Sequence, residues 1–160
     1  MKKNNLYEQT HREILSVLED EPNLTARMAT VACLLAHDFP ENIWTGFYLV
    51  DPHKTEELVV GPYQGTLGCL RIPFQKGVCG AAARTGETQV VEDVHTFPGH
   101  IACDSRSVSE IVVPVRNSAG ELIAVLDIDN PAPSVFDATD KAALEALVKD
   151  VFESDRVALA

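Results

Sequence analysis

Residues 110–129, EIVVPVRNSAGELIAVLDID, decide the fold class of this 160-residue chain. Two runs rich in β-branched side chains, Glu110–Val115 and Leu122–Asp129, flank the turn-forming stretch Asn117-Ser118-Ala119-Gly120. Two strand-like runs joined by such a turn predict a β-hairpin. The hairpin is the starting point for an antiparallel sheet.

The chain on either side of this hairpin completes an α+β domain. Helical periodicity predicts N-terminal helices within residues 5–37 and a C-terminal helix over 138–157, with Asp137 as its N-cap. The remaining predicted strands are Thr45–Val50, Glu57–Val60, Cys69–Phe74 and Gln89–Glu92. We therefore expect one domain over 1–160, with an antiparallel sheet of about six strands and the terminal helices packed on one face.

Two glycine-containing stretches interrupt the strand region, which spans residues 44–130 together with the loops of the predicted active site. Gly61–Gly68 contains three glycines and a proline, so we expect a bend there. A short helix is predicted to begin at Gly77 and to end at Thr85-Gly86.

The composition limits what the protein can bind. A net charge of −11 argues against nucleic acid or an anionic membrane as a partner, because both would be repelled. The chain has no signal-peptide pattern and no run of about 18 apolar residues, so we expect a cytoplasmic protein that does not span a membrane.

The chain contains four cysteines, Cys33, Cys69, Cys79 and Cys103. In a reducing compartment they favour metal binding or thiol chemistry over a structural disulfide. No pair has the C-x-x-C spacing, so we expect neither a metal site nor a thioredoxin-type motif. Cys69 and Cys79 are candidates for the second thiol of a redox cycle, and packing in the core is the alternative for both.

Cys103 lies in the long aperiodic segment Val94–Ser109, which we predict to be a functional loop. His95 and His100 precede it, and nearby histidines lower the pKa of a thiol. The alternative is that the segment only connects two strands and that its cysteine is a small buried residue.

Three carboxylates belong to the hairpin. Side chains alternate between the faces of a strand, so Asp127 and Asp129 share one face, and Glu110 on the neighbouring strand can join them. Crowded carboxyl groups raise one another's pKa, which keeps one protonated as an acid, and they can also bind an ammonium group. The alternative is that the aspartates cap the turn at Asn130-Pro131.

Trp44 and Tyr48 are four residues apart and share a strand face if both belong to the strand. Such a pair can form the wall of a pocket for a methyl group, and core packing is the alternative.

Residues 44–130 resemble the free methionine-(R)-sulfoxide reductases, which are GAF-domain enzymes. The resemblance is carried by WTGFYL (44–49), GPYQG (61–65), GVCG (77–80), HTFPGHIACDS (95–105), SEIVVP (109–114) and LDID (126–129). It covers more than half of the chain, and generic GAF domains lack these cysteines and carboxylates in combination.

The resemblance implies a role for each of the residues singled out above. Cys103 corresponds to the catalytic cysteine, Cys69 to the usual resolving cysteine and Cys79 to a third cysteine that can join the disulfide chemistry. The other correspondences are the substrate-site acids Glu110, Asp127 and Asp129 and the methyl-pocket residues Trp44 and Tyr48. Since a sulfoxide oxygen leaves only when protonated, we expect Glu110 or Asp129 to donate that proton. It further implies free methionine sulfoxide as substrate, thioredoxin as reductant, no tightly bound cofactor, and a possible homodimer.

The chain departs from the family pattern at Phe74-Gln75-Lys76, Gly68 and Asn130, and Cys33 has no known counterpart. These departures affect the loops near the candidate resolving cysteines, so the choice between Cys69 and Cys79 stays open.

Two other functions fit parts of this sequence. A GAF domain that senses a small ligand without turnover would need none of the thiol chemistry. A hydrolase using Cys103 with His95 or His100 would leave the other cysteines and the carboxylates without a role.

Overall fold

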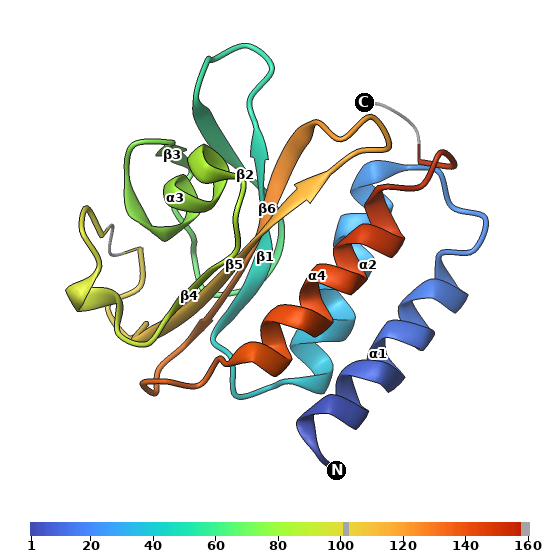
Figure 1. Ribbon diagram of the computed structural model, residues 1–160, viewed down its shortest axis with the longest axis horizontal. Helices are drawn as coiled ribbons and strands as arrows, with labels where there is room; N and C mark the ends of the chain where they lie inside the picture. Colours follow the sequence, from blue (N-terminus) through green and yellow to red (C-terminus); the bar gives the residue numbers. More distant parts are fainter. Residues whose placement is uncertain (101–102, 158–160) are drawn as a thin grey trace.

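Within residues 1–100 and 103–157, which the computed structural model describes, six strands form one antiparallel sheet in the order β3-β2-β1-β6-β5-β4 (Figure 1). The strands are β1 Trp44–Val50, β2 Glu57–Gly65, β3 Arg71–Pro73, β4 Gln89–Val91, β5 Ser109–Arg116 and β6 Leu122–Asn130. The predicted α+β class and its antiparallel sheet are confirmed.

The predicted hairpin forms β5 and β6, which lie between β1 and β4 in the sheet. Asp129 lies opposite Glu110 on β5 and opposite Trp44 on β1. Two residues along β6, Asp127 lies opposite Gly46 on β1. Directly opposed residues project to the same face of a sheet, so the three carboxylates and the indole share one face.

Three helices lie on the other face: α1 Lys3–Val17, α2 Leu24–Asp38 and α4 Ala138–Phe152 (Figure 1). The last two contact the sheet, and α1 packs on both of them. Their apolar side chains enclose a core with Phe47, Leu126 and Ile128 from the strands. The expectation that the terminal helices pack on one face is confirmed. Among the described helices, none is long and apolar enough to pass through a bilayer.

Helix α4 begins where predicted and ends early. The carboxylate of Asp137 accepts hydrogen bonds from the backbone N–H groups of Thr139 and Asp140, and the Asp140 side chain accepts one from the N–H of Asp137. The predicted end at residue 157 is wrong, because α4 stops at Phe152. Polar residues follow, and the hydroxyl of Ser154 accepts from a backbone N–H there, which favours a turn over further helix.

The short helix predicted from Gly77 is confirmed as α3, Gly77–Thr85, and it covers the face opposite these helices (Figure 1). A second core forms here from Tyr48, Val78 and Val125 with their neighbours. The backbone N–H of Gly77 donates to the carbonyl of Gly99 at 2.9 Å. This contact joins the start of α3 to the segment that leads to Cys103.

The predicted bend over Gly61–Gly68 is wrong in its first half, because β2 continues to Gly65. The pairing register of β2 against β1 shifts between Gly46 and Tyr48, which marks a β-bulge at Gly61-Pro62 of β2, opposite Phe47 of β1. A bulge accommodates a proline, whose nitrogen has no hydrogen for the strand ladder, so the strand can continue past it.

Candidate active site

A cavity of about 50 Å³ lies on the α3 side of the sheet, and β1, β3, β5, β6, α3 and two loops line it. One loop precedes β3 and the other precedes β5. Seven of the eight site residues predicted from the sequence line this cavity: Trp44, Tyr48, Cys79, Cys103, Glu110, Asp127 and Asp129. The eighth, Cys69, is covalently bonded to one of them.

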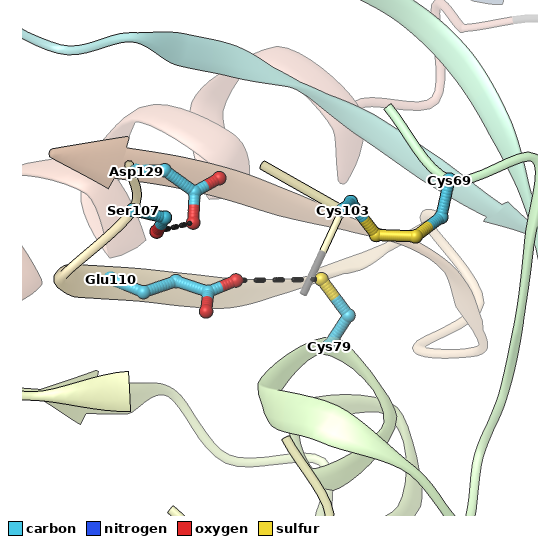
Figure 2. Close-up of a disulfide and its surroundings, with 6 residues drawn as sticks. All are labelled: Cys69, Cys79, Cys103, Ser107, Glu110 and Asp129. Carbon is cyan, nitrogen blue, oxygen red and sulfur yellow. Dashed lines mark hydrogen bonds between the residues drawn. A yellow bond between two sulfur atoms is a disulfide. The ribbon is translucent and has the colours of Figure 1, made fainter. Parts of the chain in front are cut away.

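Cys69 and Cys103 form a disulfide, with Cα atoms 5.4 Å apart and 34 residues apart in sequence (Figure 2). Cys69 lies in the loop before β3, because β3 spans only Arg71–Pro73 and not the predicted Cys69–Phe74. Cys103 is exposed and Cys69 is half-buried. A bridge between two loops, one half of which is exposed, has the placement of a redox-active disulfide. Residues 101–102 of the HIACDS motif lie outside the described residues.

Cys79 is not part of the bridge. It lies in the first turn of α3, is 4% exposed, and places its Sγ 3.9 Å from Oε1 of Glu110 (Figure 2). Burial, followed by the nearby carboxylates of Asp127, Glu110 and Asp129, raises the pKa of this thiol. The thiol therefore stays protonated at neutral pH, where a thiol is a weak nucleophile.

The three carboxyl groups form a buried acidic cluster, Glu110, Asp127 and Asp129. Burial raises the pKa of each, and for the two aspartates the neighbouring carboxylates raise it further. Asp129 accepts a hydrogen bond from the Ser107 hydroxyl at 3.0 Å. Since clustered carboxylates cannot all ionise at low cost, the cluster retains a proton near neutral pH.

No lysine or arginine lines the cavity in the described part of the chain, so the cluster has no cationic partner there. Oδ1 of Asp127 is buried and has no hydrogen-bond partner among the described residues. The alternative that the aspartates cap the following turn is wrong, because Asn130 accepts the hydrogen bond from the N–H of Ala132. A buried carboxylate oxygen in a cavity that has no partner among the described residues is suited to a cationic ligand or to a proton.

The cavity has one aromatic wall. The indole of Trp44 stacks on Tyr48 at 5.3 Å between ring centroids and on Tyr63 at 4.9 Å. Tyr63 was not among the predicted site residues, although it belongs to the GPYQG segment. A Cβ at Gly68 would lie 3.0 Å from both Trp44 Cζ2 and the Tyr48 hydroxyl, so the glycine lets the loop before β3 lie against the rings.

The two histidines near Cys103 differ in placement. His100 lines the cavity, whereas His95 pairs with Asp93 at 2.8 Å. Partial burial, and then the charge of His95, lowers the pKa of His100. Of the two, His100 is the one that lines the cavity together with Cys103.

Two polar contacts of the cavity loops were not predicted from the sequence. The Ser107 hydroxyl donates a hydrogen bond to Asp129, and Asp104 accepts a hydrogen bond from the Thr66 hydroxyl at 2.7 Å. Both contacts join residues far apart in the chain, and an aperiodic loop gives no sequence signal for them.

The model of the GAF domain matches residues 13–151. The free methionine-R-sulfoxide reductase of Escherichia coli is 40% identical over 92% of this chain and 87% of that protein, and that of Saccharomyces cerevisiae is 37% identical over 96% and 88%. The solved structure of free methionine-R-sulfoxide reductase from Neisseria meningitidis in complex with its substrate is 46% identical, covers 94% of this chain and 89% of its own, and superposes with a TM-score of 0.89.

Proposed function

This chain belongs to the GAF-domain family, and from that premise we propose that it is an oxidoreductase that reduces free L-methionine (R)-S-oxide to methionine. The resemblance to the free methionine-(R)-sulfoxide reductases is confirmed by relatives of that name at 37% and 40% identity over most of the chain. The observation that carries the proposal is the Cys69–Cys103 disulfide beside a cavity with three buried carboxyl groups.

The first step is attack by the Cys103 thiolate on the sulfur of the sulfoxide. The oxygen leaves sulfur readily only when protonated, so the step needs an acid that still holds its proton near neutral pH. Glu110 or Asp129 supplies this proton, since burial raises the pKa of both. Methionine leaves, and the oxygen atom remains on Cys103 as a sulfenic acid.

The second step regenerates the enzyme. The thiol of Cys69 attacks the sulfenic sulfur, the S–S bond forms, and the oxygen departs as water. The structure contains the disulfide that this step produces. Thioredoxin then reduces the bridge with two electrons and two protons, so the cycle needs no tightly bound cofactor. Cys79, whose thiol is buried against Glu110, has no required part in this cycle.

The cavity accounts for recognition of a free amino acid. Trp44 and Tyr48 form an apolar wall for the methyl group. Asp127, with one carboxylate oxygen unpartnered, pairs with the substrate ammonium. A peptide has no free ammonium at that position and loses the ion pair, which excludes peptide-bound methionine sulfoxide.

The disulfide form is closed to substrate. A cavity of about 50 Å³ holds a few water molecules rather than an amino acid. Reduction frees Cys103 from the loop of Cys69, so the loop can retreat and the cavity can widen. Substrate therefore binds the reduced protein, in which both cysteines are thiols. The disulfide form is the state reached at the end of a turnover.

Turnover of purified protein with dithiothreitol tests the proposal. We expect methionine from free methionine-(R)-sulfoxide, and none from the (S) epimer or a peptide-bound sulfoxide. Cys103→Ser abolishes activity, and Cys33→Ser is the matched control because Cys33 is an exposed free thiol outside the cavity. Equal rates on both epimers, or activity in Cys103→Ser, contradict the proposal.

Ligand sensing without turnover is the competing function for a GAF domain. A sensor binds its ligand without consuming thiols, so free thiols counted before and after addition of the sulfoxide separate the two. Homodimer formation and a cytoplasmic location stay predictions, which size-exclusion chromatography with light scattering and cell fractionation check.

A further inference from the structure

Two exposed leucines flank Cys69. Leu67 is 77% exposed and Leu70 is 70% exposed, and among the described large apolar residues only Met1 at the chain start is more exposed. Exposed apolar side chains that gather at one place on a surface mark interaction sites more often than scattered ones. We call this pair the leucine rim.

We propose that the leucine rim is the docking surface for an acidic dithiol protein that reduces the Cys69–Cys103 disulfide. The inference rests on the proposed function, because only a disulfide that forms in each cycle needs such a partner. Leu67 also lines the cavity, so the leucine rim, which lies in the loop before β3, adjoins the cavity.

The chemistry requires a partner that supplies two electrons. A thiolate of the partner attacks Sγ of Cys103, the more exposed half of the bridge, and Cys69 leaves as a thiolate that takes up a proton. The second thiol of the partner then attacks the mixed disulfide and releases Cys103. The partner ends as a disulfide, and the two cysteines of this chain end as thiols.

The charges near the bridge favour an acidic partner. The chain carries a net charge of −11, yet residues 66–80, from the loop before β3 to the first turn of α3, contain the cations Arg71 and Lys76 and no carboxylate. Arg71 pairs with Asp51 and Glu57, whereas Lys76 is exposed and forms no ion pair within the described residues. The acid next to the redox pair, Asp104, is paired with Arg106. A partner with negative charge can therefore approach this region.

A small thiol does not need the rim. Dithiothreitol and glutathione reach an exposed sulfur by themselves, whereas a protein must bury surface around the bond it attacks. The leucine rim therefore affects the rate with a protein reductant and has no effect on the rate with a small thiol.

The test measures reduction of the preformed disulfide by stopped flow, with no sulfoxide present. Leu70→Glu is the informative variant, because Leu70 does not line the cavity. With reduced thioredoxin we expect a second-order rate constant about tenfold lower, from lost apolar contact and added negative charge. With dithiothreitol or glutathione we expect no change. Leu70→Met restores the rate with thioredoxin.

Val17→Glu is the matched control. Val17 is 60% exposed and lies on α1, across the sheet from the bridge, so thioredoxin reduces this variant at the unaltered rate. Unaltered rates with thioredoxin in Leu70→Glu, or an equal fall with dithiothreitol, overturn the docking surface. Because no sulfoxide is present, this outcome is independent of the methionine-forming assay that tests the proposed function.

Discussion

The hydroxyl of Thr66 donates a hydrogen bond to Oδ2 of Asp104 over 2.7 Å. Thr66 precedes Cys69 by three residues and Asp104 directly follows Cys103, so the bond joins the two loops that carry the redox pair. Hydrogen bonds from Arg106, and then from Thr66, lower the pKa of Asp104. The carboxylate is therefore ionised at neutral pH and remains an acceptor.

Removing the Thr66 hydroxyl slows disulfide formation. Thr66→Val loses one hydrogen bond between the loops, which is worth about 1 kcal/mol and corresponds to a rate about fivefold lower. Trapping the Cys103 sulfenic acid with dimedone after a single turnover measures its lifetime. Thr66→Ser keeps the hydroxyl and serves as the control. Equal lifetimes in Thr66→Val and the unaltered protein show that the bond does not position the loops.

Replacing the proton donor lowers the rate of methionine formation. Either Glu110→Gln or Asp129→Asn is expected to reduce kcat by about 10²-fold, in line with the contribution of general acids. The rate of the unaltered enzyme falls as the pH rises through the raised pKa of the donor, because the ionised acid has no proton to give. The variant in which this alkaline decline disappears identifies the donor.

Neutralising Asp127 stabilises the fold. The pKa of Asp127 is raised in the folded state, so the unfolded chain loses the proton first and stability declines as the pH rises above about 4. Asp127→Asn avoids this cost. We expect an increase of about 1–3 kcal/mol in the free energy of unfolding at pH 8 and little change at pH 3. Urea denaturation at both pH values measures the difference, and a destabilised variant at pH 8 contradicts the assignment.

The two free cysteines of the oxidised protein differ in reactivity. Cys33 is exposed on α2 and Cys79 is buried with a raised pKa. Iodoacetamide at about pH 7.5 should alkylate Cys33 in the native protein and Cys79 only after unfolding. Peptide mass spectrometry locates the label. Fast native labelling of Cys79 would show that its thiol is accessible and able to enter the disulfide chemistry.

Oxidation state controls substrate binding. The disulfide form should bind neither methionine sulfoxide nor methionine, because its cavity is about 50 Å³. A Cys69→Ser variant cannot form the bridge and should bind methionine measurably in calorimetry. Comparable binding by the disulfide form contradicts a closed oxidised state.

Local patterns were enough to predict most of the fold. The strand-like runs and the turn at Asn117-Ser118-Ala119-Gly120 predicted the hairpin, and Asp137 predicted the start of α4. The errors lie where local patterns are ambiguous. The proline in β2 suggested a bend because the compensating bulge depends on pairing with β1, and the end of α4 was placed too late because polar residues do not exclude a helix.

The sequence alone determined which side chains share a face, because the alternation along a strand is a property of the local backbone. Asp127 and Asp129 project to one side of β6 whatever the rest of the chain does. The amphipathic helices and their shared core follow from periodicity in the same way.

Only the tertiary structure decided which thiol pairs with Cys103. Closing a loop to Cys69 or to Cys79 differs by only about 0.3 kcal/mol in chain entropy, so sequence separation could not choose between them. The fold puts Cys69 in the loop before β3, where it is bonded to Cys103, and packs the Cys79 thiol against Glu110. Which cysteine forms the disulfide with Cys103 depends on which segments, distant in sequence, pack together in the fold. No local sequence pattern determines that packing.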